Sequence, residues 1–128
     1  MRRPFGKLVV AVAIVAGVVA AYLAYDRKSM IDTTLTWARL APIPTDAVDF
    51  KITTEGNMFT RRFRASFRAP AGAIQKWLAD SPGTKDATPS HPNPVFREFN
   101  IAPGGGAQHA EVTVNDSQGL VSIYVEWS

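Results

Sequence analysis

The feature that most constrains this chain is an uncharged run of eighteen residues, LVVAVAIVAGVVAAYLAY, from Leu8 to Tyr25. A helix of this length would extend roughly 27 Å at about 1.5 Å per residue, close to the hydrocarbon thickness of a bilayer. Aromatic residues bracket the run, with Phe5 before it and Tyr22 and Tyr25 at its far end, as in helices that cross a membrane. The run therefore predicts a single transmembrane helix over residues 8–25.

Two other interpretations of the run stay open. The basic residues Arg2, Arg3 and Lys7, together with the small residues at positions 19–21, are also compatible with a cleaved secretory signal. A buried helix of a soluble protein is the third interpretation, although such helices rarely contain so long an uncharged stretch. The bracketing aromatic residues favour the retained anchor.

The basic residues beside the span predict its orientation. Three of them lie in the tail of residues 1–7, whereas two, Arg27 and Lys28, follow the span. The positive-inside rule then places this tail in the cytoplasm and exports the rest of the chain, to the periplasm if the cell is bacterial. The chain contains no cysteine, so an exported domain would have no disulfide to form.

The net charge of +3 is concentrated before the domain. Residues 1–28 carry five basic and one acidic side chain, whereas residues 29–128 carry nine basic and ten acidic side chains. The domain therefore lacks the basic excess that is typical of nucleic-acid binding, and no nucleic-acid partner is expected. The basic tail is expected to contact anionic headgroups of the lipid bilayer.

The residues after the span suffice for one small domain with a modest core. Residues 26–46 are predicted to form a juxtamembrane connector, and residues 47–128 an exported domain. Residues 29–32, with the sequence Ser-Met-Ile-Asp, have the form of a capping box and predict a short helix that ends before Pro42. This helix belongs either to the connector or to the packed body of the domain.

A β-hairpin is predicted over residues 47–68, where apolar and polar residues alternate. Gly56-Asn57 is a turn signal, and we expect these two residues to form the loop. The cross-strand pairs would then be Phe50 with Phe63 and Asp49 with Arg64. The apolar face of the second strand would comprise Phe59, Phe63, Ala65 and Phe67.

The rest of the chain predicts one helix and three strands. Pro70 begins a helix with Ile74, Trp77 and Leu78 on one face, and a proline-rich loop follows over residues 82–94. The strands are expected at residues 95–101, 107–115 and 120–127.

The loop between the last two strands decides their register. A four-residue loop at 116–119 places apolar residues opposite each other, pairing Val114 with Val121 and Val112 with Ile123. The predicted fold class is therefore α+β, an antiparallel sheet of order ββαβββ with one covering helix.

The same register brings polar side chains together on the other side of the sheet. It places His109 opposite Glu126 and Glu111 opposite Tyr124, while the second histidine, His91, lies in the proline-rich loop. A zinc or iron site needs three or four closely placed donors, and only His109, Glu111 and Glu126 are candidates. Cross-strand pairing on a solvated face explains this group better, so no metal ion is expected.

An arginine row on the second strand is the candidate docking site. Arg62, Arg64 and Arg68 are separated by even numbers of residues, which places their side chains on one face of the strand. Guanidinium groups bind carboxylates and phosphates well, so the row is expected to contact an acidic partner surface or lipid headgroups. A solvated face neutralised by Asp49 and neighbouring acids is the alternative.

No motif indicates catalysis. The glycine run at residues 103–106 precedes a strand rather than a helix, unlike a phosphate-binding loop. Neither Ser66 nor Ser122 lies in the context of a nucleophile elbow. The chain is therefore expected not to be an enzyme and to bind no cofactor.

Small residues in the span suggest helix packing within the membrane. Ala13, Gly17 and Ala21 repeat at intervals of four and would allow another helix to approach closely. A solitary anchor with a narrow face is the alternative.

Two functions remain open. The favoured one is a single-pass accessory or structural subunit of a membrane protein assembly, with other membrane protein subunits as partners. The alternative is an independent membrane-tethered binding module for a peptide, a glycan or a small ligand. A homo-oligomer agrees with either function.

Overall fold

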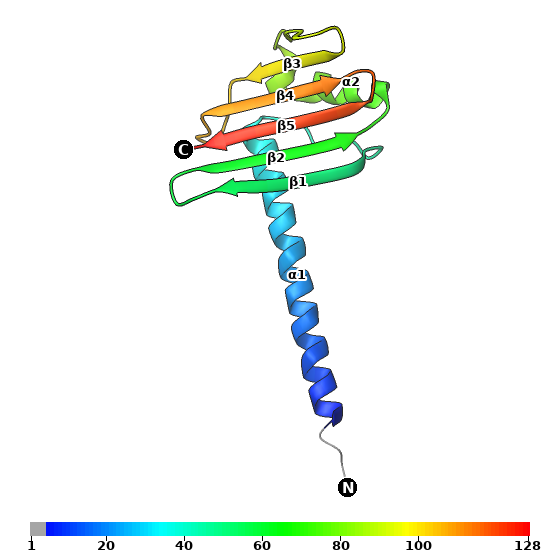
Figure 1. Ribbon diagram of the computed structural model, residues 1–128, viewed down its shortest axis with the longest axis vertical. Helices are drawn as coiled ribbons and strands as arrows, with labels where there is room; N and C mark the ends of the chain where they lie inside the picture. The colour runs from blue at the N-terminus through cyan, green and yellow to red at the C-terminus, as the bar shows by residue number, and fades with distance from the viewer. Residues whose placement is uncertain (1–4) are drawn as a thin grey trace.

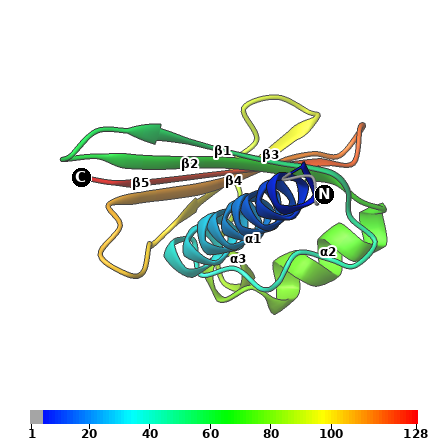
Figure 2. The same ribbon diagram turned by 90° about the horizontal axis from the view of Figure 1, so that it is seen from below.

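The computed structural model describes residues 5–128 and contains one five-stranded antiparallel sheet with helices on one of its faces (Figures 1 and 2). Arg2 and Arg3 of the predicted basic tail lie outside the described residues. The elements in chain order are α1 (Phe5–Trp37), β1 (Val48–Gly56), β2 (Arg61–Arg68), α2 (Ala71–Asp80), α3 (Pro82–Lys85), β3 (Phe96–Ile101), β4 (His109–Asn115) and β5 (Leu120–Trp127). The strand order is β1-β2-β5-β4-β3, and the predicted α+β class is confirmed.

Helix α1 is longer than the sequence pattern predicts. It continues without a break from the apolar run through residues 29–32, so the interpretation of these residues as the start of a second helix is wrong. The hydroxyl of Thr36 donates instead to the carbonyl of Asp32 at 2.8 Å, within the continuous helix. The helix ends where Arg39 adopts a positive φ of 53° and the Leu40 amide donates to the carbonyl of Leu35 at 2.8 Å.

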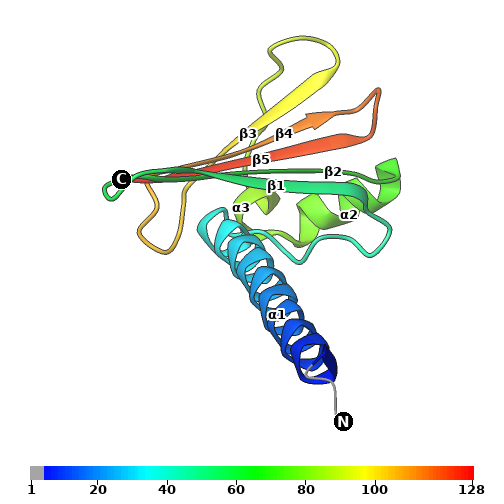
Figure 3. The ribbon, with the colours of Figure 1, turned by 60° about the horizontal axis from the view of Figure 1, so that its bottom comes forward.

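The last turns of α1 are part of the domain. Thr34 and Ala38 are buried, and the Trp37 ring meets the Phe63 ring edge-on with centroids 5.4 Å apart. Of the two interpretations of this segment, the structure therefore favours a packed helix of the body. Figure 3 shows α1 leaving the helical side of the sheet and extending away from it toward the N-terminus.

The predicted covering helix is confirmed in α2. Ile74, Trp77 and Leu78 are all buried and face the sheet. The indole nitrogen of Trp77 donates to the carbonyl of Ala41 at 2.9 Å, and its ring meets Phe67 edge-on at 5.3 Å. The first residues of the predicted proline-rich loop form the short helix α3 instead of a loop.

The register predicted for the first hairpin is wrong. Phe63 lies opposite Thr54, not Phe50, and Arg64 lies opposite Thr53, not Asp49. The observed loop comprises residues 57–60, because the Asn57 side-chain oxygen accepts hydrogen bonds from the amides that follow it. The shift is an even number of residues, so the same side chains of β2 still face the core.

In the observed register Phe59 lies outside the sheet. Its side chain lies in the loop and is 73% exposed, whereas the rest of the predicted apolar face, Phe63, Ala65 and Phe67, is buried. At the other end of β1, Asp49 has a positive φ of 54° within a register shift between Val48 and Lys51. Such a bulge bends the strand and adds twist.

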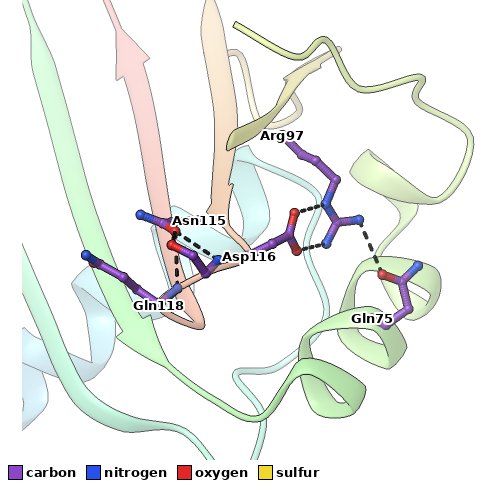
Figure 4. A network of polar contacts seen from close by, with 6 residues as sticks. Gln75, Arg97, Asn115, Asp116 and Gln118 are labelled. Carbon is purple, nitrogen blue, oxygen red and sulfur yellow. Dashed lines mark hydrogen bonds and ion pairs between the residues drawn. The ribbon is translucent and has the colours of Figure 1, made fainter. Parts of the chain in front are cut away.

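The register predicted for β4 and β5 is confirmed. Val114 pairs with Val121 and Val112 with Ile123 across a loop of residues 116–119. The Asn115 side-chain oxygen accepts from the amides of Ser117 and Gln118 at 3.1 and 3.2 Å (Figure 4). An asparagine at the start of a turn therefore stabilises the loop in both hairpins.

An ion pair joins this loop to the edge of the sheet and to α2. The Arg97 guanidinium of β3 donates to both carboxylate oxygens of Asp116, at 2.9 and 2.8 Å (Figure 4). Its remaining nitrogen donates to the side chain of Gln75 on α2 at 3.3 Å. Two parallel hydrogen bonds to one carboxylate fix the geometry of the pair.

Candidate functional site

The outer face of the sheet, opposite the helices, contains the predicted docking residues. All three helices lie on the other side of the sheet, and no helix of the described chain covers this face (Figure 2). Side chains alternate along β2, so that Phe63, Ala65 and Phe67 enter the core. Arg62 and Arg64 therefore project from the outer face together with polar side chains of β4 and β5.

Arg62 and Arg64 meet two residues of β5. The register places Arg62 opposite Glu126 and Arg64 opposite Tyr124. The Nε atom of Arg62 lies 3.7 Å from a carboxylate oxygen of Glu126. The Tyr124 hydroxyl donates to the other oxygen of that carboxylate at 2.9 Å, and the Arg64 guanidinium lies 4.6 Å from the centre of the tyrosine ring.

The third arginine of the row lies apart from this group. Arg68 is opposite Leu120, and its Nε atom lies 4.0 Å from a carboxylate oxygen of Asp49. Asp49 therefore lies near Arg68 and not near Arg64, with which it was predicted to pair. Among the described residues, Arg64 forms no ion pair, so it is the member of the row best placed to bind an external carboxylate.

The predicted pairing of polar residues between β4 and β5 is confirmed. His109 lies opposite Glu126 and Glu111 opposite Tyr124. The imidazole of His109 lies 3.2 Å from the Glu111 carboxylate, and its ring centre is 5.7 Å from that of Tyr124. Within residues 5–128, no group of three His, Cys, Asp or Glu side chains is arranged to hold a metal ion. His91 is exposed in the segment before β3.

A shallow groove crosses the outer face beside this group. It is lined by residues of four strands, β1, β2, β4 and β5: Lys51, Thr53, Arg64, Ala65, Ser66, Glu111, Thr113, Ser122, Ile123 and Tyr124. Basic, acidic and hydroxyl groups all face it. Such a surface can form hydrogen bonds and ion pairs with another protein, but its open shape does not enclose a small molecule.

The pKa of Tyr124 lies above its ordinary value of 10.0. Partial burial is the largest cause, followed by the hydrogen bond to Glu126 and the negative charge of that carboxylate, whereas Arg62 and Arg64 oppose the rise. Because the folded-state pKa is raised, this contribution to stability is fully present below about pH 10 and is lost as the pH rises through the folded-state value.

We expect Glu126→Gln to lower the pKa of Tyr124, because the substitution removes the carboxylate charge. The chain contains three tyrosines, so Tyr22→Phe and Tyr25→Phe together leave Tyr124 as the only one. Absorbance of the tyrosinate ion against pH then measures its titration in the full-length protein. An identical titration with and without the Glu126 carboxylate would show that the hydrogen bond does not form.

The predicted packing residues of the span lie along α1. Ala13, Gly17 and Ala21 are exposed, and a Cβ atom added at Gly17 would meet nothing within 4 Å. The residues are spaced by four within one continuous helix, so they share a face. This chain supplies no neighbour to that face in the described region, which is therefore open to another helix.

The contact between Arg64 and Tyr124 was not predicted from the sequence. The pairing of β4 with β5 follows from a short loop, but β2 reaches β5 only through the arrangement of the whole sheet. Alternating arginines on β2 and polar residues on β5 were visible, but no signal in the sequence aligned one strand with the other.

Comparisons with protein-family models, curated proteins and solved structures gave no match.

Proposed function

We propose that this chain is a single-pass accessory or structural subunit of a membrane protein assembly, with a cytoplasmic N-terminus and an exported α+β domain that contacts other proteins. The observation that supports this best is the continuity of α1 from the apolar segment into the domain core. A helix without a hinge holds the domain in a fixed position relative to the span. A fixed position suits a subunit that occupies one place in an assembly, whereas a flexible linker would let a binding module reach a larger volume.

The membrane anchor itself is supported by length and composition. The helix from Val10 to Trp37 is apolar and long enough to cross a membrane, and an N-terminal signal sequence shares these properties. The large apolar side chains between Val10 and Tyr25 are exposed in the isolated chain. A lipid bilayer or neighbouring helices would remove this surface from water.

Native mass spectrometry of the full-length protein, extracted from its own membranes in mild detergent, tests the proposal. An intact chain within a larger complex of defined mass would support an anchored subunit. A chain that lacks about 21 residues would show a cleaved signal instead. A solitary intact chain would favour the tethered binding module.

We expect Gly17→Leu to weaken association with the assembly by about tenfold or more, because leucine would keep a neighbouring helix from close approach. Val15→Leu is the matched control, since position 15 lies on the opposite side of the helix. Co-purification of the partner subunits from detergent measures both variants. Equal recovery with the two variants would show that this face of α1 is lipid-exposed rather than packed.

Replacement of Arg62, Arg64 and Arg68 by serine is expected to weaken association and to reduce its dependence on salt concentration. Loss of the guanidinium groups removes the positive charges that an acidic partner surface would bind. Lys76 and Lys85 on the helical side of the sheet, also replaced by serine, provide the control. The docking role is wrong if the arginine variant co-purifies with its partners as well as the lysine variant does at every salt concentration.

A binding module remains the second candidate because the domain has a further groove. It lies between the segment after α1 and helix α2, and its lining includes Pro42, Ile43, Pro44, Lys76 and Trp77. Apolar and proline side chains with a few charged neighbours are typical of sites that hold extended peptides. Saturable binding of a peptide by a solitary full-length chain would favour this function.

A further inference from the structure

The loop between β1 and β2 exposes two large apolar side chains next to each other. Met58 is 86% exposed and Phe59 is 73% exposed. The loop that carries them is ordered, since the Asn57 side chain accepts from the Phe59 amide at 2.8 Å and from the Thr60 amide at 3.1 Å. An apolar pair held outward in this way adds nothing to the core of the domain.

The position of β1 places this loop beside the expected membrane surface. β1 is an edge strand, and Figure 1 shows it as the strand nearest to the N-terminal part of α1, with the β1–β2 loop at its end. The Arg27 guanidinium lies 5.7 Å from the centre of the Phe50 ring in β1. Arg27 follows the apolar run by only two residues, so β1 lies at the level where the lipid headgroups begin.

A second copy of this chain cannot cover the β1 edge within the same membrane. Antiparallel pairing of two β1 strands needs a twofold axis perpendicular to the sheet. Because α1 runs roughly in the plane of the sheet (Figures 1 and 2), that axis would lie parallel to the membrane. The second span would then point in the opposite direction.

The opposite edge of the sheet is protected by the chain itself. Ser90 and Glu98 of β3 exchange two backbone hydrogen bonds of 2.9 Å. In the described part of the chain, no strand pairs with the outer edge of β1. Exposed strand edges tend to associate with other chains unless something covers them.

We propose that Met58 and Phe59 insert into the headgroup region of the bilayer that holds the span, and that the β1 edge rests on this surface. This contact depends on the membrane anchor of the proposed function. It gives the domain a second attachment, in addition to α1, and prevents the sheet from tilting about the end of the span. The outer face with Arg64 is then held upright and accessible to a neighbouring protein.

Apolar insertion, rather than charge, is the main source of this contact. The charged side chains along this border have both signs: the basic ones are Arg27, Lys28, Lys51, Arg61 and Arg68, and the acidic ones are Asp26, Asp49 and Glu55. The three acidic groups offset much of the basic charge and so limit the net attraction to anionic lipid. Aromatic and other large apolar side chains, in contrast, partition readily into the membrane interface.

The absence of cysteine allows a direct test with single labelled positions. The full-length Met58→Cys variant, in which Phe59 is retained, is labelled at the cysteine with an environment-sensitive fluorophore. The labelled protein is then placed in phosphatidylcholine vesicles. Lipids with a spin label near the headgroup quench the fluorophore if it enters the interface. Thr88→Cys, in the exposed segment before β3, is the water-exposed reference, and Val15→Cys in the span is the membrane-embedded reference.

We expect the label at position 58 to be quenched about threefold more than the label at position 88. Addition of Phe59→Ser should reduce this quenching to the level of position 88, and anionic lipid should change it little. The label at position 15 should be quenched by spin labels placed deep in the bilayer, which shows that the span is inserted. If the label at position 58 is then quenched no more than the label at position 88, the loop contact is wrong but the membrane anchor stands. A label at 15 that is accessible to water would overturn the membrane anchor, and the loop contact with it.

Discussion

Replacement of Trp77 by alanine is expected to lower the free energy of unfolding of the domain by about 3–5 kcal/mol. The side chain is only 3% exposed, its ring meets Phe67 at 5.3 Å, and its indole nitrogen donates to the Ala41 carbonyl at 2.9 Å. Alanine would leave a large cavity between α2 and the sheet and would remove the donor to that carbonyl. Because domains of this size have total stabilities of about 5–15 kcal/mol, this loss would remove a large share of the stability of the domain.

Urea unfolding of the full-length protein in detergent measures the effect, with hydrogen exchange at the amides of β2 and β5 as the readout. Trp127→Ala is the matched control, since Trp127 is 39% exposed at the end of β5. We expect this control to cost about 1 kcal/mol or less. Trp77→Phe should lie between the two, because phenylalanine retains part of the ring contact but not the hydrogen bond. Equal losses from the two alanine variants would contradict the role of α2 as the cover of the sheet.

The two hairpins show which parts of the fold follow from sequence. In the β4–β5 hairpin, only one loop length places Val114 opposite Val121, and the structure has that register. In the β1–β2 hairpin, the predicted and observed registers both keep the apolar residues of β2 on the core side. The alternation therefore could not distinguish them, and the hydrogen bonds of the Asn57 side chain determine the loop.

Long-range contacts limited the prediction of the candidate site. The cross-strand pairing of His109 with Glu126 was predictable because a short loop joins β4 and β5. The contact of Arg64 with Tyr124 joins strands that are distant in sequence, and no local pattern specifies which strands become neighbours. The continuation of α1 into the core was missed for a related reason. The motif at residues 29–32 resembles a helix start, but contacts of Thr34 and Ala38 with the domain favour one long helix.

Gly83 is a position where the addition of a single methyl group is expected to have a large cost. A Cβ atom built there would lie 2.3 Å from the carbonyl oxygen of Ala38 and 2.9 Å from a methyl group of Ile101. The Gly83 amide donates to the Arg39 carbonyl at 2.7 Å, so the backbone just after α1 is already in direct contact with α3. We expect Gly83→Ala to lower the free energy of unfolding by about 2–3 kcal/mol, because the backbone at the end of α1 would have to move.

Gly72→Ala provides a control of opposite sign. A Cβ atom at Gly72 in α2 meets nothing within 4 Å, so alanine there is expected to stabilise the protein by about 0.5–1 kcal/mol through helix propensity. Urea unfolding of both variants in detergent measures the difference. Because Gly83 lies against the end of α1, its substitution should also loosen the sheet relative to the span and reduce quenching of a label at position 58. Unchanged stability in Gly83→Ala would show that α3 is not in close contact with the backbone that follows α1, and the fixed position of the domain on its helix would lose one of its structural supports.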